Sequence, residues 1–338
     1  MHPLTPQLLT FVWLLSLPCL AWSQGTNRTL DANARQIKFG DGRVYIGSMK
    51  DQQFSGYGML LDPRRDTIYA GDFLANKQHG LGKYFYKNGE VYEGEWANGE
   101  KHGYGRMTYK SGDVYEGEWQ HDLRQGQGVY TYIDGAIYKG EFQNGIIQGQ
   151  GEYAKPGTTY IGTWANGLRH GEGYEVVIGT NEMQEYRGNY EYGKPQGKGY
   201  WKYEKDSTIT GYNGNWQAGR RWGEGIYIVN GREYHGHWQE DEITGLGTVF
   251  LPDGSKYEGR LLKSLYTGQG VFAGADGSLY DGNWQRGKRH GYGKQIYADG
   301  SAYEGEWHND LPHGQGTFTR TNGQVSRGTF EGGKYTGI

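Results

Sequence analysis

The sequence predicts an all-β fold, an elongated single-layer antiparallel sheet of tandem β-hairpin repeats that forms a twisted or curved ribbon. The motif Tyr-Glu-Gly-Glu-Trp occurs at 92–96, 115–119 and 303–307. Looser copies, a tyrosine with glycine two positions later, recur in steps of 22 to 26 residues from Tyr45 to Tyr303. The 61 glycines and 30 tyrosines of the 338 residues largely follow this period. A fixed period of about 20–50 residues is the signature of a repeat architecture.

Residues 91–113 illustrate how one repeat is expected to fold. From Val91 to Trp96, aromatic residues and glycine alternate with glutamate, which is the period-two pattern of a strand. Asn98-Gly99 is a strong hairpin-turn signal. A second strand is expected over 103–109, where two glycines share a face with Met107 and Tyr109. Ser111-Gly112 then turns the chain into the next repeat, and the array contains about 12–13 such units.

Paired glycines in each second strand indicate close packing of rings. A glycine leaves room for a large ring to lie across the backbone, so the aromatic residues of one hairpin are expected to cover the glycines of a neighbour. Two central repeats are longer, with their extra residues near 178–184 and 204–210. Insertions in repeat proteins usually form loops on one face, which is the expectation here.

The N-terminal segment differs from the repeats. Residues 8–22 are apolar but shorter than the roughly 20 residues that span a bilayer. Ala21-Trp22-Ser23 matches a small-x-small cleavage pattern, which predicts a signal peptide over 1–23, cleaved after Ser23. An uncleaved anchor is the alternative. We therefore expect a linker over 24–43, an array over 44–338, and export to the periplasm, the cell surface or the medium.

Charge and cysteine content exclude several classes of function. The formal net charge is −3, so the chain lacks the basic character of a nucleic-acid-binding protein. The single cysteine, Cys19, lies inside the predicted signal peptide, so no disulfide is expected in the mature chain.

Repeated histidines and glutamates are the main candidates for chemistry. His79, His102, His170, His290 and His313 precede a paired glycine, but equivalent positions of adjacent hairpins lie about 9–10 Å apart, too far to share one zinc ion. Glutamate pairs such as Glu93/Glu95 recur on a face expected to be open to solvent, with no pocket to shift a pKa. No nucleophile elbow, phosphate-binding loop or kinase motif is present. We expect no catalytic residue, no metal site, no cofactor and no enzymatic activity.

The stretch Tyr92–Gly105, Tyr-Glu-Gly-Glu-Trp-x-Asn-Gly-x-x-His-Gly-x-Gly, resembles the MORN repeat. The resemblance extends over about 44–337. It implies an elongated, curved sheet that binds partner proteins or lies at membranes, and in some family members an α-helix lies in an aromatic-lined groove. Some members carry a catalytic domain beside the array, which is not expected here.

The function predicted is that of a non-catalytic binding or scaffold protein whose partner is another protein or a second copy of the chain. Its aromatic face would bind a helix or peptide, and the free C-terminal strand edge would allow self-association. The alternative is binding of glycan or membrane lipid at the cell envelope. The predicted contact residues are Tyr92, Trp96, Tyr109, Tyr115, Trp119, Tyr132, Tyr138, Trp164, Trp216, Trp238, Tyr280, Trp284, Tyr303 and Trp307.

Overall fold

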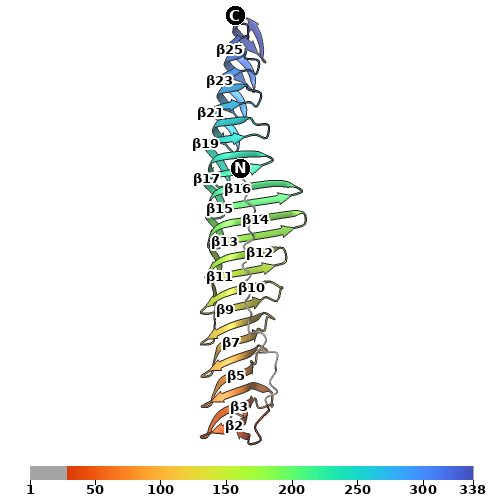
Figure 1. Cartoon of the computed structure of the whole chain (residues 1–338), viewed down its shortest axis with the longest axis vertical. Helices are drawn as coiled ribbons and strands as arrows, with labels where there is room; N and C mark the ends of the chain where they lie inside the picture. Colours follow the sequence, from red (N-terminus) through yellow and green to blue (C-terminus); the bar gives the residue numbers. More distant parts are fainter. Residues whose placement is uncertain (1–28, 338) are drawn as a thin grey trace. The chain divides into compact units, whose positions relative to one another are not determined.

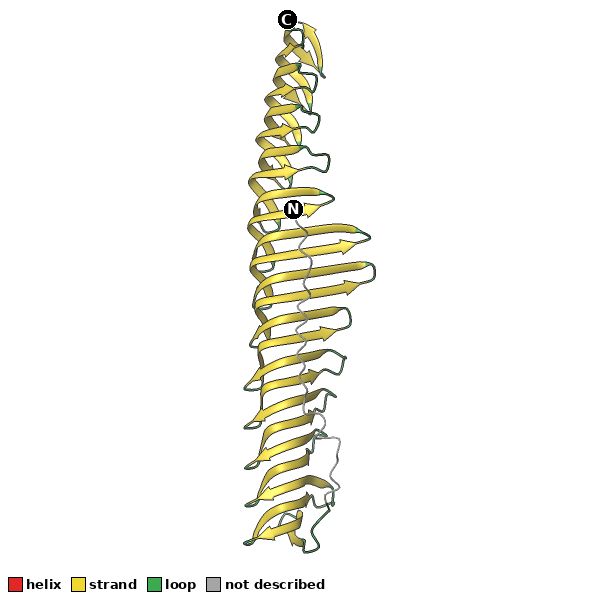
Figure 2. Ribbon diagram, in the orientation of Figure 1, coloured by secondary structure: helices red, strands yellow, loops and turns green. Residues whose placement is uncertain are grey.

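The computed structural model describes residues 29–337, and its chain divides into two compact units. The first contains the described residues up to Lys87 together with Val91–Glu100, and the second contains Asn88–Glu90 and all residues from Lys101 onwards. The predicted signal peptide and its cleavage site lie outside the described residues. Throughout the described range the chain consists of strands joined by short turns, with no helix (Figure 2). Accordingly, no described helix is long and apolar enough to cross a membrane.

The first unit is an antiparallel sheet in which each strand pairs with the next one along the chain. Part of the segment expected as a linker belongs to this sheet, because Arg35–Lys38 pair with Val44–Gly47. The first-unit strands are β1 (Arg35–Lys38), β2 (Val44–Lys50), β3 (Gln53–Leu61), β4 (Thr67–Leu74), β5 (Lys77–Phe85) and β6 (Val91–Ala97).

The second unit repeats the same pattern, and Figure 1 shows its strands following one another in sequence order. Each is antiparallel to its neighbours, which confirms the predicted sheet of tandem hairpins. The second-unit strands are β7 (Glu100–Thr108), β8 (Val114–Gln120), β9 (Leu123–Thr131), β10 (Ile137–Gln143), β11 (Ile146–Lys155), β12 (Thr158–Ala165), β13 (Leu168–Gly179), β14 (Glu182–Glu191), β15 (Lys194–Lys205), β16 (Thr208–Gln217), β17 (Arg220–Val229), β18 (Arg232–Gln239), β19 (Glu242–Phe250), β20 (Lys256–Leu262), β21 (Leu265–Ala273), β22 (Leu279–Gln285), β23 (Lys288–Ile296), β24 (Ala302–His308), β25 (Leu311–Thr319), β26 (Val325–Glu331) and β27 (Lys334–Gly337).

The two glycines of each pair have different structural roles. In the β8–β9 hairpin the register shifts after Gly117, and Gly126 adopts a positive φ of 61° at this irregularity. The Glu118 carboxylate accepts a hydrogen bond from the backbone N–H of Gln127, 3.0 Å away, next to this bulge. The second glycine, Gly128, instead lies beneath the Tyr115 ring. Sequence reasoning assigned ring packing to both glycines and therefore missed the bulge.

The two longer repeats correct one expectation. Their extra residues do not form loops but lengthen the strands, so β13 and β15 have 12 residues each. Pairing continues to the tips, where Gly179 is opposite Glu182 and Lys205 is opposite Thr208. In Figure 1 these hairpins extend beyond their neighbours on one side of the second unit.

Candidate binding groove

A tyrosine ring closes nearly every hairpin. Tyr115 lies over Gly117 of its own strand and over Gly128 of the paired strand, where an added Cβ would come within 2.5 Å of its hydroxyl oxygen. The hydroxyl donates to the Glu118 carbonyl oxygen three residues later, at 2.9 Å. The ring therefore covers the glycines of its own hairpin, and not those of a neighbour as expected. Ten further tyrosines donate in the same way: Tyr45, Tyr69, Tyr92, Tyr138, Tyr160, Tyr186, Tyr212, Tyr257, Tyr280 and Tyr303.

A second side chain covers the other side of the tyrosine ring in several hairpins. The Arg124 guanidinium lies 5.7 Å from the Tyr115 ring centre, and Arg289 lies at the same distance from Tyr280. In two other hairpins this position is aromatic, and Phe54 and Tyr266 each stack at 3.8 Å between ring centres on Tyr45 and Tyr257. Burial raises the pKa of Tyr280 to about 12. The covered tyrosines therefore belong to the core.

The tryptophans connect one repeat to the preceding one. The Trp119 indole N–H donates to the Gly105 carbonyl oxygen, 3.2 Å away on the preceding strand. Trp96, Trp164, Trp216, Trp238, Trp284 and Trp307 make the equivalent bond, at 2.9–3.2 Å. The indole N–H groups thus bond to glycines of a neighbouring repeat, but the rings that lie over the paired glycines are the tyrosines of the same hairpin.

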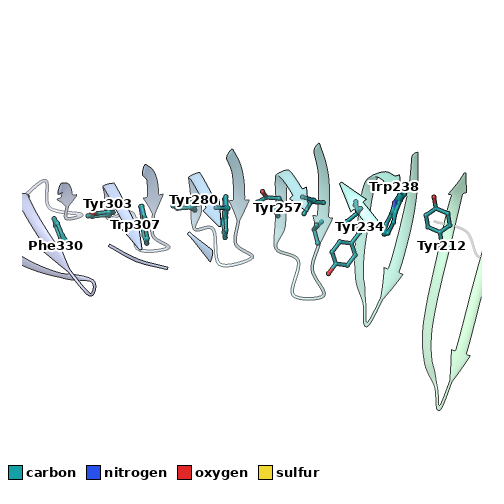
Figure 3. Packing of buried hydrophobic residues seen from close by; sticks show 12 residues of the cluster. Tyr212, Tyr234, Trp238, Tyr257, Tyr280, Tyr303, Trp307 and Phe330 are labelled. Atoms are coloured by element: carbon teal, nitrogen blue, oxygen red, sulfur yellow. The ribbon is translucent and has the colours of Figure 1, made fainter. Parts of the chain in front are cut away.

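One hairpin departs from this arrangement. The Tyr234 hydroxyl points the opposite way from that of Tyr212 (Figure 3). Ile243, which is fully buried, lies nearest to Gly236 in place of the tyrosine ring. Figure 3 otherwise shows buried rings recurring from one hairpin to the next.

Most of the predicted contact residues are buried. The buried ones are Tyr92, Trp96, Tyr115, Trp119, Tyr138, Trp164, Trp238, Tyr280, Trp284, Tyr303 and Trp307. Tyr109, Tyr132 and Trp216 keep part of their surface exposed. These eleven rings therefore pack within the sheet, and their predicted role as exposed contact residues is wrong. Substitution of Trp96 or Trp119 would therefore lower the stability of the sheet, so it is not a specific test of partner binding.

The first groove lies on the tyrosine-covered face of β9 to β13. It is an open hollow of about 610 Å3, lined by Tyr132, Tyr153, Trp164, Arg169 and Val177 among others. Tyr132 and Tyr153 meet edge to face at 6.4 Å between ring centres. Arg169 forms an ion pair with Glu175. The long strand β13 supplies both Glu175 and Val177, so its extra length enlarges the side of the groove that this strand forms.

A second groove of about 640 Å3 lies on the equivalent face of β21 to β23. Its lining includes Tyr266, Phe272, Trp284, Arg289 and Tyr297. Arg289 is held by the Asp310 carboxylate at 3.4 Å and by the Gln295 side-chain oxygen at 2.8 Å. Both grooves thus offer aromatic rings beside a fixed guanidinium, which suits apolar contact and hydrogen bonding. The first groove adds the aliphatic side chains of Ile147, Leu168 and Val177.

Several groove residues were missing from the sequence prediction. Tyr153 and Phe272 lie in the second strands of their hairpins, and Tyr297 directly follows one. From these parts of the repeats the predicted set took only Tyr109 and Tyr132, which also directly follow a second strand. The signal for them was present, since each lies four or six residues after the first glycine of a pair, as Tyr130 and Tyr132 do.

The candidate glutamates stabilise the fold or form ion pairs at the surface. Glu118 and Glu306 bind backbone N–H groups beside the bulges, while Glu93 and Glu116 form ion pairs with Lys83 and Arg106. His308 comes within 5.0 and 5.6 Å of His290 and His313, measured between ring centres. Among the described residues, no group of three or more histidine, cysteine, aspartate or glutamate side chains is arranged to hold a metal ion.

The hairpin geometry defines a repeat protein built from tandem two-stranded units, nearly all of them closed by a tyrosine over two glycines. The family model "MORN repeat" matches eleven segments between residues 69 and 325, which together cover more than half of the chain. The chain belongs to the MORN-repeat family. The hairpin that begins at Tyr45 lies outside the matched segments but has the same hydroxyl bond and glycine packing. MORN repeats are typically binding or scaffold modules that mediate protein or membrane interactions.

Two other comparisons add little. A search of the curated proteins finds no match. The solved structure described as "Streptogramin B lyase structure" is similar at 12% identity over 88% of this chain and 83% of that chain. Its TM-score is 0.13, so it carries no argument about fold or function.

Proposed function

We propose that this chain is a non-catalytic binding or scaffold protein that receives a helix or peptide of a partner protein on the groove face of its second unit. The observation that carries the proposal is the pair of open grooves of about 610 and 640 Å3, both floored by aromatic rings. Aromatic side chains supply large, stiff contact area at interfaces. Partly exposed rings such as Tyr132, Tyr153 and Phe272 are the anchors in this proposal.

Placement of a photo-cross-linking amino acid in source cells tests the proposal. The groove positions are Tyr132 and Phe272, and the matched control positions are Tyr174 and Tyr292, whose exposed rings lie on the opposite face. We expect protein adducts from the groove positions and few from the controls. An adduct with a second copy of this chain would support self-association. Lipid or glycan adducts would favour the alternative ligands, and equal yields from both faces would contradict the groove as the site.

We also propose that the chain is exported, on the basis of the apolar run 8–22 and the Ala21-Trp22-Ser23 pattern. We expect the protein isolated from its source to begin at Gln24, as measured by mass spectrometry of its N-terminal peptide. Recovery of a peptide that still contains residues 1–23 would contradict cleavage.

A further inference from the structure

Two cations without a carboxylate partner lie at the first groove: Lys155 lines it, and Arg124 covers the tyrosine ring of the preceding β8–β9 hairpin. At the position that covers the tyrosine ring, Arg169, Arg221 and Arg289 pair with Glu175, Asp241 and Asp310. The Arg124 guanidinium instead donates to the Gly145 carbonyl oxygen and lies 5.2–5.7 Å from the centres of three aromatic rings. None of the described carboxylates forms an ion pair with it.

Lys155 is a second such cation. It is exposed at the end of β11, it lines the first groove, and it forms no ion pair with any described residue. Arg124 lies near the start of β9, one hairpin before the β10–β11 hairpin that carries Lys155. The second groove has the opposite character. Asp276 and Asp299 line it, and Arg289, the one cation among its described lining residues, is already paired.

Apolar residues follow the edge of the first groove. Leu123, Ile146 and Leu168 each begin the second strand of a hairpin. Each is opposite the residue that follows the aromatic position repeated in most hairpins, here Trp119, Phe142 and Trp164. All three are nearly half exposed, and Leu168 lines the groove. In the next repeats this position holds Lys194, Arg220 and Glu242, so three apolar residues in a row occur only here within the second unit.

The spacing of the hairpins selects the form of the partner. Successive hairpins repeat about every 9–10 Å, because each adds two strands. Seven residues of an α-helix rise about 10.5 Å. A helix lying along the array therefore presents residues i, i+7 and i+14 to equivalent positions of three successive hairpins.

We propose that the groove section from Leu123 to Val177 binds an amphipathic, acidic helix of a partner protein. Its aliphatic side chains lie over Tyr132, Ile147 and Tyr153, and its carboxylates pair with Arg124 and Lys155. This inference rests on the proposed function and adds the chemical character of the partner. Charge complementarity of this kind fixes orientation and speeds association.

Selection from a displayed library of helical peptides tests this inference with the full chain as the target. The library fixes aliphatic residues at heptad spacing and varies the flanking positions among Glu, Lys, Gln and Ser. We expect Glu to be enriched over Lys at these positions. The affinity of the selected peptides should fall about tenfold, or about 1.4 kcal/mol, in the double variant Arg124→Ile, Lys155→Gln.

The substitutions are chosen so that they leave the fold of the hairpins intact. Isoleucine already occupies the position of Arg124 in the next repeat, as Ile147, so Arg124→Ile should leave the hairpin intact. Lys198→Glu, an exposed charge reversal on the opposite face, should leave the affinity unchanged. Peptides that bind in the groove without acidic preference, and equally well to the double variant, would overturn this inference while leaving the proposed function standing. Failure to enrich any peptide would also overturn it, and the cross-linking result would then decide the proposed function separately.

Discussion

Replacement of Trp238 by alanine is expected to lower the free energy of unfolding of the second unit by about 3–5 kcal/mol, the usual cost of removing a buried large aromatic side chain. The Trp238 side chain is 1% exposed, and its indole N–H donates to the Gly225 carbonyl oxygen at 3.1 Å. The Arg221 guanidinium lies 4.5 Å from the ring centre. The substitution removes a large apolar side chain, one hydrogen bond and one cation–π contact together.

Hydrogen exchange of the β16–β19 amides is the appropriate measurement, because long repeat arrays need not unfold in a single step. Tyr292→Ala is the control, since that ring is 58% exposed on the opposite face, and its effect should stay within about 0.5 kcal/mol. If Trp238→Ala lowered protection from hydrogen exchange no more than Tyr292→Ala does, Trp238 would not be a core residue. Its predicted role as a partner-contact residue would then be favoured.

The fold was largely predictable because its signals are local and repeated. Asn98 and Gly99 have positive φ values of 54° and 89°, as a tight hairpin turn with this pair requires. The alternation in Tyr92–Trp96 corresponds to buried and exposed positions in β6. The error lay in the longer repeats, where Val176, Val177 and Ile178 favour continued strand. A two-residue turn at Thr180-Asn181 then lets the added backbone groups pair with each other across the hairpin.

The candidate site was less predictable than the fold. Period-two alternation places the rings from three different positions of the repeat on the same face of the sheet, whether or not they are buried. Tyr115, Trp119 and Tyr132 all point to this face, yet only Tyr132 keeps exposed surface. What separates them is the covering side chain, such as Arg124 opposite Trp119. That pairing depends on a bulge that shifts the register between the paired strands. The sequence shows the glycine that permits the bulge but not how far the register moves.

The two grooves show where the repeat leaves room for specificity. The tyrosine, the glycines and most of the tryptophans are fixed by packing, so they have little freedom to vary with the ligand. The covering position varies more, with arginine, isoleucine, proline and aromatic residues along the array. Because this position borders the grooves, at Ile147, Arg169, Tyr266 and Arg289, its sequence sets their charge and apolar character. One scaffold can thus present different surfaces along its length.

A matched pair of glycine substitutions tests whether the packing of a tyrosine ring over two glycines is the main interaction that stabilises a hairpin. In Gly259→Ala, the new Cβ would lie 2.5 Å from the Tyr257 hydroxyl oxygen and 2.5 Å from Gly270 Cα. The ring and the paired strand would both have to move, which breaks the ring's hydrogen bond to the Arg260 carbonyl oxygen and its stacking on Tyr266. We expect a loss of about 3 kcal/mol, the upper end of the usual cost of overpacking.

Gly236→Ala is the control at the equivalent position of the hairpin in which the tyrosine has turned away. There the new Cβ would meet the Ile243 terminal methyl group at 3.2 Å and the Leu246 carbonyl oxygen at 3.3 Å, contacts that small shifts relieve. Because alanine also restricts the unfolded chain, we expect a change below about 1 kcal/mol. Chemical denaturation of the full chain, with hydrogen exchange of β18–β21, compares the two. Equal losses would show that both glycines are required by the backbone alone, and that the tyrosine ring does not impose the requirement at Gly259.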